Sequence, residues 1–136
     1  MTRDRKSFKK FHELCDNISP NLLLIKDYEK NIFGGYTNVC WENTDCKKTD
    51  HKSFLFSLNK NKKYFPKNKY DSQILCFPDS GPRFASGNIG FQDRDMGVCI
   101  STRGGEYLNE SLSTNDPGYI FPVKEVEFYH ITFDNN

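Results

Sequence analysis

Alanine, the residue that most favours an α-helix, occurs only once in this chain of 136 residues, as Ala85. The aromatic and β-branched side chains that pack well in β-strands are abundant instead, with twelve Phe, seven Tyr, eight Ile and four Val. Nine Gly, six Pro and thirteen Asn supply turns at short intervals. The chain is therefore predicted to be mostly β, of the α+β class. Because an AT-rich genome produces the same bias, the aromatic content alone does not indicate a binding surface.

The length and charge of the chain limit the classes of protein that it fits. A mass of 15.9 kDa suits one hydrophobic core, and no repeat or linker divides residues 1–136, so a single domain is expected. A net charge of +1 produces no large electrostatic field that would attract the protein to nucleic acid or to an anionic membrane. The mean hydropathy is −0.73, no apolar run reaches the roughly 20 residues of a membrane helix, and Met1–Lys6 lacks the apolar stretch of a signal peptide. A soluble, cytoplasmic protein without a transmembrane segment or a nucleic-acid partner is expected.

One helix and a series of strands follow from the apolar patterns. Phe8, Phe11 and Cys15 recur at helical spacing and predict an amphipathic helix over Lys6–Asp16. Apolar runs bounded by turn residues predict strands over Leu22–Ile25, Ile32–Tyr36, Ser53–Leu58, Ile74–Phe77, Ile89–Phe91, Val98–Ile100 and Val123–Phe133.

The first and last of these strands have predicted positions in a sheet. Leu22–Ile25 is apolar on both faces, which predicts a central strand in a hairpin with Ile32–Tyr36. Val123–Phe133 is long and apolar, and we expect it to close a sheet. The adjacent glycines Gly34 and Gly35 predict either a bulge or a close backbone approach within their strand.

The middle of the chain is expected to hold a second hairpin. Ser53–Leu58 is apolar on both faces, so both faces need cover. A loop over 59–71 is expected to connect it to Ile74–Phe77. The preceding segment, Asn38–Lys52, is polar and is expected to be irregular around Trp41.

The loop over 59–71 is the most basic part of the chain. Five lysines alternate there with three aromatic residues, the ingredients for binding a nucleic-acid backbone and stacking its bases. No arginine is available for bidentate reading of bases, and lysine-rich turns are commonly just solvated. We therefore favour a solvated hairpin. If this loop binds anything, an acidic patch of a partner protein fits it as well as nucleic acid does. The candidate docking residues are Lys60, Lys62, Lys63, Lys67 and Lys69.

Glu125 and Glu127 are two residues apart on a predicted strand and so point the same way. Such a pair suits acid/base catalysis, but it shares its face with the apolar Tyr129, Ile131 and Phe133. A structural role is therefore favoured, with at least Glu127 buried or half-buried and bonded to the backbone or to a partner such as an arginine.

The cysteines give no clear site. Five are present, an odd number with no C-x-x-C pair, which indicates free thiols: Cys15, Cys40, Cys46, Cys76 and Cys99. Cys15 near His12 and Cys76 within an apolar strand suit burial better than nucleophilic catalysis. Cys40, Cys46 and His51, with Cys76 or Asp50 as a fourth ligand, are too widely spaced for a usual structural zinc site. With no nucleotide-binding or hydrolase motif either, no catalytic, cofactor or metal residue is predicted.

Five sequence blocks, in order, resemble the TLDc domain of the oxidation-resistance proteins. They are Phe11-His12-x-x-Cys15-Asp16-Asn17, Ile32-Phe33-Gly34-Gly35-Tyr36-Thr37, Phe54-Leu55-Phe56-Ser57-Leu58, Gly81-Pro82-x-Phe84 and Val123-x-Glu125-Val126-Glu127-Phe128. Trp41 follows the second block, and the resemblance spans residues 8 to 131. The family usually has further elements upstream of the first block, and these are expected to be missing here. The chain is therefore expected to be a shortened or divergent member from a protist.

The resemblance implies a sandwich of two antiparallel β-sheets with one or two short flanking helices. It also implies a non-catalytic interaction module that binds and regulates the vacuolar proton-pumping ATPase and contributes to resistance against oxidative stress. Gly34, Gly35, Trp41, Gly81, Glu125 and Glu127 are then taken as structural residues. The alternative from another class is a thiol-dependent antioxidant or hydrolytic enzyme that uses one of the cysteines.

Overall fold

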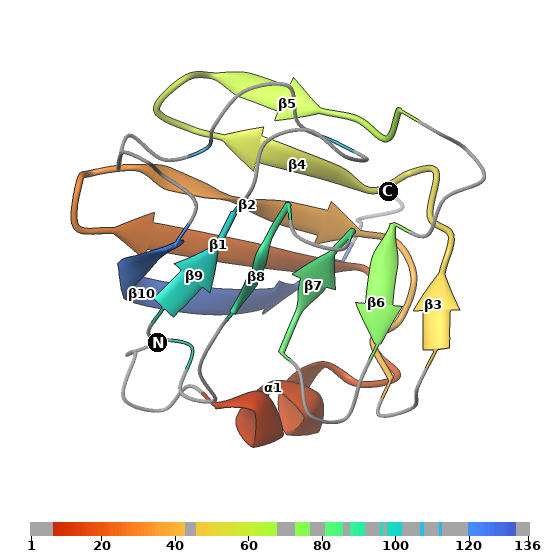
Figure 1. The fold of residues 1–136 in the computed structure, drawn as a ribbon. Helices are drawn as coiled ribbons and strands as arrows, with labels where there is room; N and C mark the ends of the chain where they lie inside the picture. Colours follow the sequence, from red (N-terminus) through yellow and green to blue (C-terminus); the bar gives the residue numbers. More distant parts are fainter. Residues whose placement is uncertain are drawn as a thin grey trace.

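Figure 1 shows the computed structural model of the protein, which describes residues 7–42, 46–67, 73–76, 81–85, 88–91, 96, 98–101, 107, 112 and 120–132. Within these residues the chain forms one α-helix and ten strands, and the strands make two antiparallel sheets. The predicted mostly β sandwich is therefore confirmed.

The helix α1 covers Phe8–Cys15 and lies at one end of the sandwich (Figure 1). The Ser7 hydroxyl accepts a hydrogen bond of 3.0 Å from the backbone N–H of Lys10, which satisfies one of the N–H groups that the first turn leaves open. The three residues at helical spacing, Phe8, Phe11 and Cys15, are buried, as predicted.

The larger sheet has seven strands in the order β5-β4-β2-β1-β10-β9-β8. In that order the strands cover Lys62–Tyr64, Phe54–Ser57, Ile32–Thr37, Asn21–Asp27, Ile120–His130, Val98–Ile100 and Gly90–Phe91. β1 has β2 on one side and β10 on the other, so the prediction of a central first strand is confirmed. The hairpin of β1 and β2 is confirmed as well.

The smaller sheet has the order β3-β6-β7, with strands over Cys46–Lys48, Ile74–Cys76 and Arg83–Phe84. An isolated bridge between Phe84 and Ile89 places β7 beside β8 of the larger sheet. In Figure 1, the strands β9, β8, β7, β6 and β3 consequently run side by side in front of β10, β1, β2, β4 and β5. These two rows are the layers of the sandwich.

β10 corrects one expectation from the sequence. The last strand was expected to close a sheet, but it begins at Ile120 and has a neighbour on each side. Residues 120–122 pair with β9 and residues 123–130 pair with β1, with a register irregularity opposite Lys26 and Asp27. Such an irregularity bends and twists a strand, which allows β10 to pair with β1 in one layer and with β9 in the other. The predicted end at Phe133 lies outside the described residues.

The hairpin after β4 is a second correction. β4 pairs with β5, whereas Ile74–Cys76 lies in the other sheet as β6. β5 consists of Lys62, Lys63 and Tyr64, and only Tyr64 is buried, so this edge strand carries no apolar run that could reveal it. The short strand β3 likewise lies in a segment that was expected to be irregular, because its three residues, Cys46–Lys48, are polar or small.

Aromatic side chains connect the two layers and the helix. Trp41 is 3% exposed and packs edge-on against Phe84 of β7, with 5.6 Å between ring centroids. On its other side Trp41 packs edge-on against Phe11 of α1 at 5.3 Å. Phe11 in turn lies 5.2 Å from Phe128 of β10. The interior is therefore filled by aromatic rings from α1, from both layers and from the segment around Trp41.

Candidate functional site

The outer face of the larger sheet, the face turned away from the smaller sheet, carries a cluster of apolar side chains. Strand register determines which residues share this face, because side chains alternate along each strand. Tyr36 of β2 lies between Leu22 of β1 and Phe54 of β4. One step along the strands, Gly34 lies between Leu24 and Phe56.

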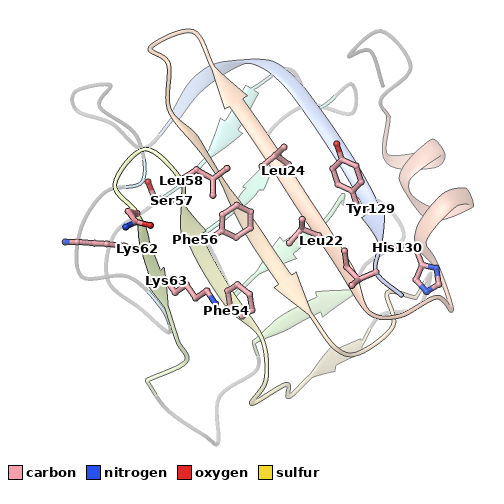
Figure 2. A pocket seen from close by; sticks show the side chains of 12 residues that line it. Leu22, Leu24, Phe54, Phe56, Ser57, Leu58, Lys62, Lys63, Tyr129 and His130 are labelled. Carbon is pink, nitrogen blue, oxygen red and sulfur yellow. The ribbon is translucent and has the colours of Figure 1, made fainter. Parts of the chain in front are cut away.

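An open groove of about 810 Å³, which we call the outer-face groove, lies on this face (Figure 2). It is lined by Leu22, Leu24, Phe54, Phe56, Ser57, Leu58, Asn61, Lys62, Lys63, Tyr129, His130 and Ile131. In Figure 2 the lysines of β5 stand on one side and Tyr129 and His130 on the other, with the apolar side chains between them. An apolar hollow with a polar margin is typical of a surface that binds a partner or a ligand.

Gly34 lies on this face between Leu24 and Phe56. A β-carbon added to Gly34 would overlap the carbonyl oxygen of Leu23 and would lie 2.9 Å from Cζ of Phe56. The strand pairing on both sides of Gly34 continues without a shift, so the glycine pair reflects close approach and not a bulge. Without a side chain at Gly34, the Phe56 ring leans over the backbone of β2.

The aromatic side of the groove is partly open to solvent. Tyr36 stacks on Phe54 with 5.1 Å between centroids, and Phe65 lies 5.9 Å from Phe54 on the other side. Phe65 is 59% exposed and Leu58 is 57% exposed. The sequence predicted that both faces of β4 need cover, yet Phe54 is only half-buried and lines the open groove. Solvent-exposed apolar side chains in this arrangement gain from contact with another apolar surface.

Of the candidate docking lysines, the structure brings Lys62 and Lys63 to the groove. The Nζ of Lys63 lies 5.0 Å from the centroid of Phe54, a cation–π contact at the margin. Lys60 lies in the β4–β5 turn, where its backbone N–H donates to the Ser57 hydroxyl at 3.2 Å. Lys67 is exposed beyond β5, and Lys69 lies outside the described residues. Lysines on an edge strand also discourage unwanted strand pairing, so this position has a structural use too.

Glu125 and Glu127 lie on the same outer face, on the β10 side. Glu125 forms an ion pair of 3.5 Å with Lys26 of β1, and the Tyr129 hydroxyl donates a hydrogen bond to Glu127. This hydrogen bond, together with burial and the charges of both glutamates, raises the pKa of Tyr129 above its usual value. Among the described residues, the partners of these glutamates are therefore a lysine and a tyrosine. The two glutamates thus lie on the β10 side, where Lys26 pairs with Glu125, and Lys62 and Lys63 lie on the other side.

Burial favours the protonated thiol at two of the cysteines. The pKa of Cys76 is raised, first by burial and then by the neighbouring Cys46 thiol, against the opposing effects of Glu42 and Lys48. Burial raises the pKa of Cys99 even further. Cys15 is buried on α1. Among the described residues, no three His, Cys, Asp or Glu side chains are grouped to hold a metal ion, and His51 is exposed on a turn.

The remaining candidate structural residues lie in the interior. The ring of Phe84 packs against Gly35, and a β-carbon on Gly81 would lie 2.9 Å from the Phe8 ring. The backbone of Trp41 accepts a hydrogen bond of 2.8 Å from the N–H of Asn17, which fixes the end of α1.

Sequence reasoning missed the groove, although one signal for it was present. Leu22–Ile25 and Ser53–Leu58 are both apolar on two faces, and the second apolar face of each strand is the one that lines the groove. The sequence alone assigned that second face to the interior, because an apolar face is usually covered.

Comparison with known proteins adds one positive finding. A family model described as the TLDc domain matches residues 1–132. No curated protein matches the chain. In the part of the chain that the structure describes, no helix is long and apolar enough to cross a membrane.

Proposed function

Because the chain belongs to the TLDc domain family, we propose that it is a non-catalytic protein-interaction module that binds and regulates the vacuolar proton-pumping ATPase. Through this interaction it contributes to resistance against oxidative stress. The outer-face groove is the proposed docking site, and the partner is a subunit of the ATPase.

The open apolar groove beside a basic margin is the observation that carries this proposal. Contact with the exposed Leu58 and Phe65 side chains removes apolar surface from water and so favours association. Lys62 and Lys63 at the margin favour acidic side chains on the partner, because opposite charges speed association and set its orientation. The proposed occupant is therefore a segment of the ATPase subunit with apolar residues that fill the groove and acidic residues that reach the two lysines.

The experiment measures binding of the purified chain to purified vacuolar ATPase by biolayer interferometry. Two groove variants are compared with the wild type: Leu58→Ser removes an exposed apolar contact, and the double variant Lys62→Glu/Lys63→Glu reverses the basic margin. Each is expected to weaken binding by about tenfold or more, the size of effect usual for a well-placed interface residue. Matched controls are Leu14→Ser, an exposed leucine on α1, and Lys9→Glu/Lys52→Glu, two exposed lysines outside the groove.

The outcomes separate the partner from the docking face. Weaker binding of the groove variants but not of the controls supports both parts of the proposal. Equal binding of all variants would place the docking face elsewhere on the molecule. No binding of the wild type to the ATPase would reject the partner. ATP-driven acidification of vacuolar vesicles, measured with and without added protein, tests regulation in the same samples.

A further inference from the structure

Cys46 and Cys76 lie directly opposite one another on neighbouring antiparallel strands. They are register partners in the pairing of β3 with β6. Directly opposed residues in antiparallel strands have Cα atoms about 4.5–5.5 Å apart, and a disulfide needs about 4.4–6.8 Å. The register of these strands is therefore compatible with a bond between the two sulfurs without a large movement of the backbone.

The two thiols are in contact but differ in their access to solvent. The Cys46 thiol lies close enough to Cys76 to raise the pKa of the Cys76 thiol. Cys76 is 1% exposed, whereas Cys46 is half-buried. Cys46 is therefore the more accessible residue of the pair, and Cys76 is the buried one.

Glu42 touches both cysteines and is itself held in place. The Cys46 thiol donates to Oε2 of the Glu42 carboxylate at 3.6 Å, and the backbone of Glu42 lies close enough to Cys76 to act against the rise in the pKa of that thiol. The other carboxylate oxygen, Oε1, forms an ion pair of 2.7 Å with Nζ of Lys48. The Lys48 ammonium also donates to the carbonyl oxygen of Cys40 at 2.6 Å. A proton acceptor is thus fixed beside the accessible thiol, with a positive charge close to the Cys76 sulfur.

We propose that Cys46 and Cys76 form a peroxide-reactive thiol pair that closes to a disulfide between β3 and β6. In the first step the Cys46 thiol passes its proton to the Glu42 carboxylate, and the Cys46 sulfur attacks a peroxide oxygen. The O–O bond breaks, the other peroxide oxygen leaves as an alcohol or water after it takes that proton, and Cys46 becomes a sulfenic acid. The peroxide is the oxidant in this step.

In the second step the Cys76 sulfur attacks the Cys46 sulfur. The S–S bond forms, the S–O bond breaks, and the hydroxyl group leaves as water with the proton of Cys76. Two thiols and one peroxide thus give one disulfide, one alcohol or water, and one further water. Because this pair lies on the smaller sheet, the inference is independent of the outer-face groove on the larger sheet.

The test exposes the purified, folded chain to hydrogen peroxide at neutral pH and follows its intact mass. The mass is expected to fall by two hydrogen atoms, and digestion without a reductant is expected to release a peptide pair joined through Cys46 and Cys76. The disulfide is expected to form about tenfold faster in the folded chain than in urea, because folding holds the sulfurs together. Equal rates in the two conditions, or a different cysteine pairing in the folded chain, would overturn the proposal.

Variants identify the residues responsible. Cys46→Ser is expected to abolish the disulfide, whereas Cys15→Ser and Cys99→Ser, which change buried cysteines elsewhere, leave it unchanged. Cys40→Ser is the sharper control because Cys40 is close to Lys48, and loss of the disulfide in that variant would reassign the pair.

Glu42→Gln keeps all five thiols and is expected to slow the reaction about tenfold, in line with the loss of one proton acceptor. A circular dichroism spectrum of each variant shows whether it folds, and the comparison of folded and unfolded wild type decides the proposal if one does not.

Discussion

The ring of Phe84 lies directly against the backbone of Gly35, so closely that a β-carbon on the glycine would be 2.6 Å from the ring atom Cζ. Phe84 belongs to the smaller sheet and Gly35 to the larger one, so this contact helps to set how closely the two layers approach. The ring has no free direction in which to move, because Trp41 and Tyr107 pack edge-on against it at 5.6 and 6.3 Å.

Substitution of Gly35 by alanine is therefore expected to destabilise the protein. The expected loss in free energy of unfolding is about 1–3 kcal/mol, the usual cost of forcing an extra carbon into a packed core. Gly34→Ala is expected to cost at least as much, since the obstacle there is the Leu23 backbone. Urea unfolding gives the values. Gly90→Ala is the matched control: its β-carbon would have ordinary contacts of 3.8 and 3.9 Å, and its effect should stay within about 0.5 kcal/mol.

A buried carboxylate connects the two sheets, and its removal is expected to be costly. Asp50 is 4% exposed and accepts hydrogen bonds from the Thr37 hydroxyl at 2.8 Å and from the backbone N–H groups of Asn38 and Lys52 at 2.6 and 3.0 Å. Its own N–H donates to the Gln73 side chain at 2.8 Å. Asp50→Ala leaves the donors unpaired, so we expect a loss of about 2–4 kcal/mol in urea unfolding.

The control for Asp50→Ala is a variant that keeps the shape of the Asp50 side chain. Asp50→Asn retains an acceptor oxygen and is expected to lose clearly less stability than Asp50→Ala. Equal losses for the two variants would show that the hydrogen bonds are not the source of the effect.

The protonation of Cys76 predicts a loss of stability at high pH. Burial raises the pKa of this thiol from 9.0 to about 11 in the folded state. Between these values the folded state holds the proton and the unfolded state releases it, so stability falls as the pH rises through this window. The contribution of Cys76 is roughly 1–3 kcal/mol, present below pH 9 and lost by about pH 11.

Other groups titrate in the same pH range, so the effect of Cys76 is measured as the difference between wild type and a variant that lacks this thiol. Urea midpoints of wild type and Cys76→Ala are compared between pH 8 and about 11, and the wild type is expected to lose more stability over the window. Parallel curves for the two proteins would contradict the assignment.

Reversal of the lysine charges is expected to change association and leave folding nearly intact. Each of the substitutions Lys60→Glu, Lys62→Glu and Lys63→Glu changes the local charge by two units, and exposed substitutions usually shift stability by no more than about 0.5 kcal/mol. If the lysines meet an acidic partner, the triple variant associates more slowly than wild type at low salt. Added salt should slow the wild type toward the variant, because charges separated by more than about 8 Å are screened in physiological buffer. Equal association rates of wild type and the triple variant at low salt would show that these lysines belong to a solvated turn that does not contact the partner.

The helix and the strand content could be predicted from the sequence because both depend on local patterns. The spacing of Phe8, Phe11 and Cys15 defines one apolar face of a helix wherever that helix packs. Runs such as Leu22–Ile25 indicate a strand, and the short polar turn after β1 allows only a hairpin with β2. The order of the family blocks could also be recognised without coordinates.

Strand partners and surfaces depended on contacts between distant residues. A period of two shows which side chains share a face of a strand, but it does not show which strand lies alongside or whether that face is covered. Sequence pattern therefore paired β4 with Ile74–Cys76, whereas the structure pairs it with the polar strand β5. The same limit hid the outer-face groove, which needs Gly34 to lie between Leu24 and Phe56. It also hid the opposition of Cys46 and Cys76, thirty residues apart in the chain, since only the packing of the whole sandwich brings β3 and β6 together.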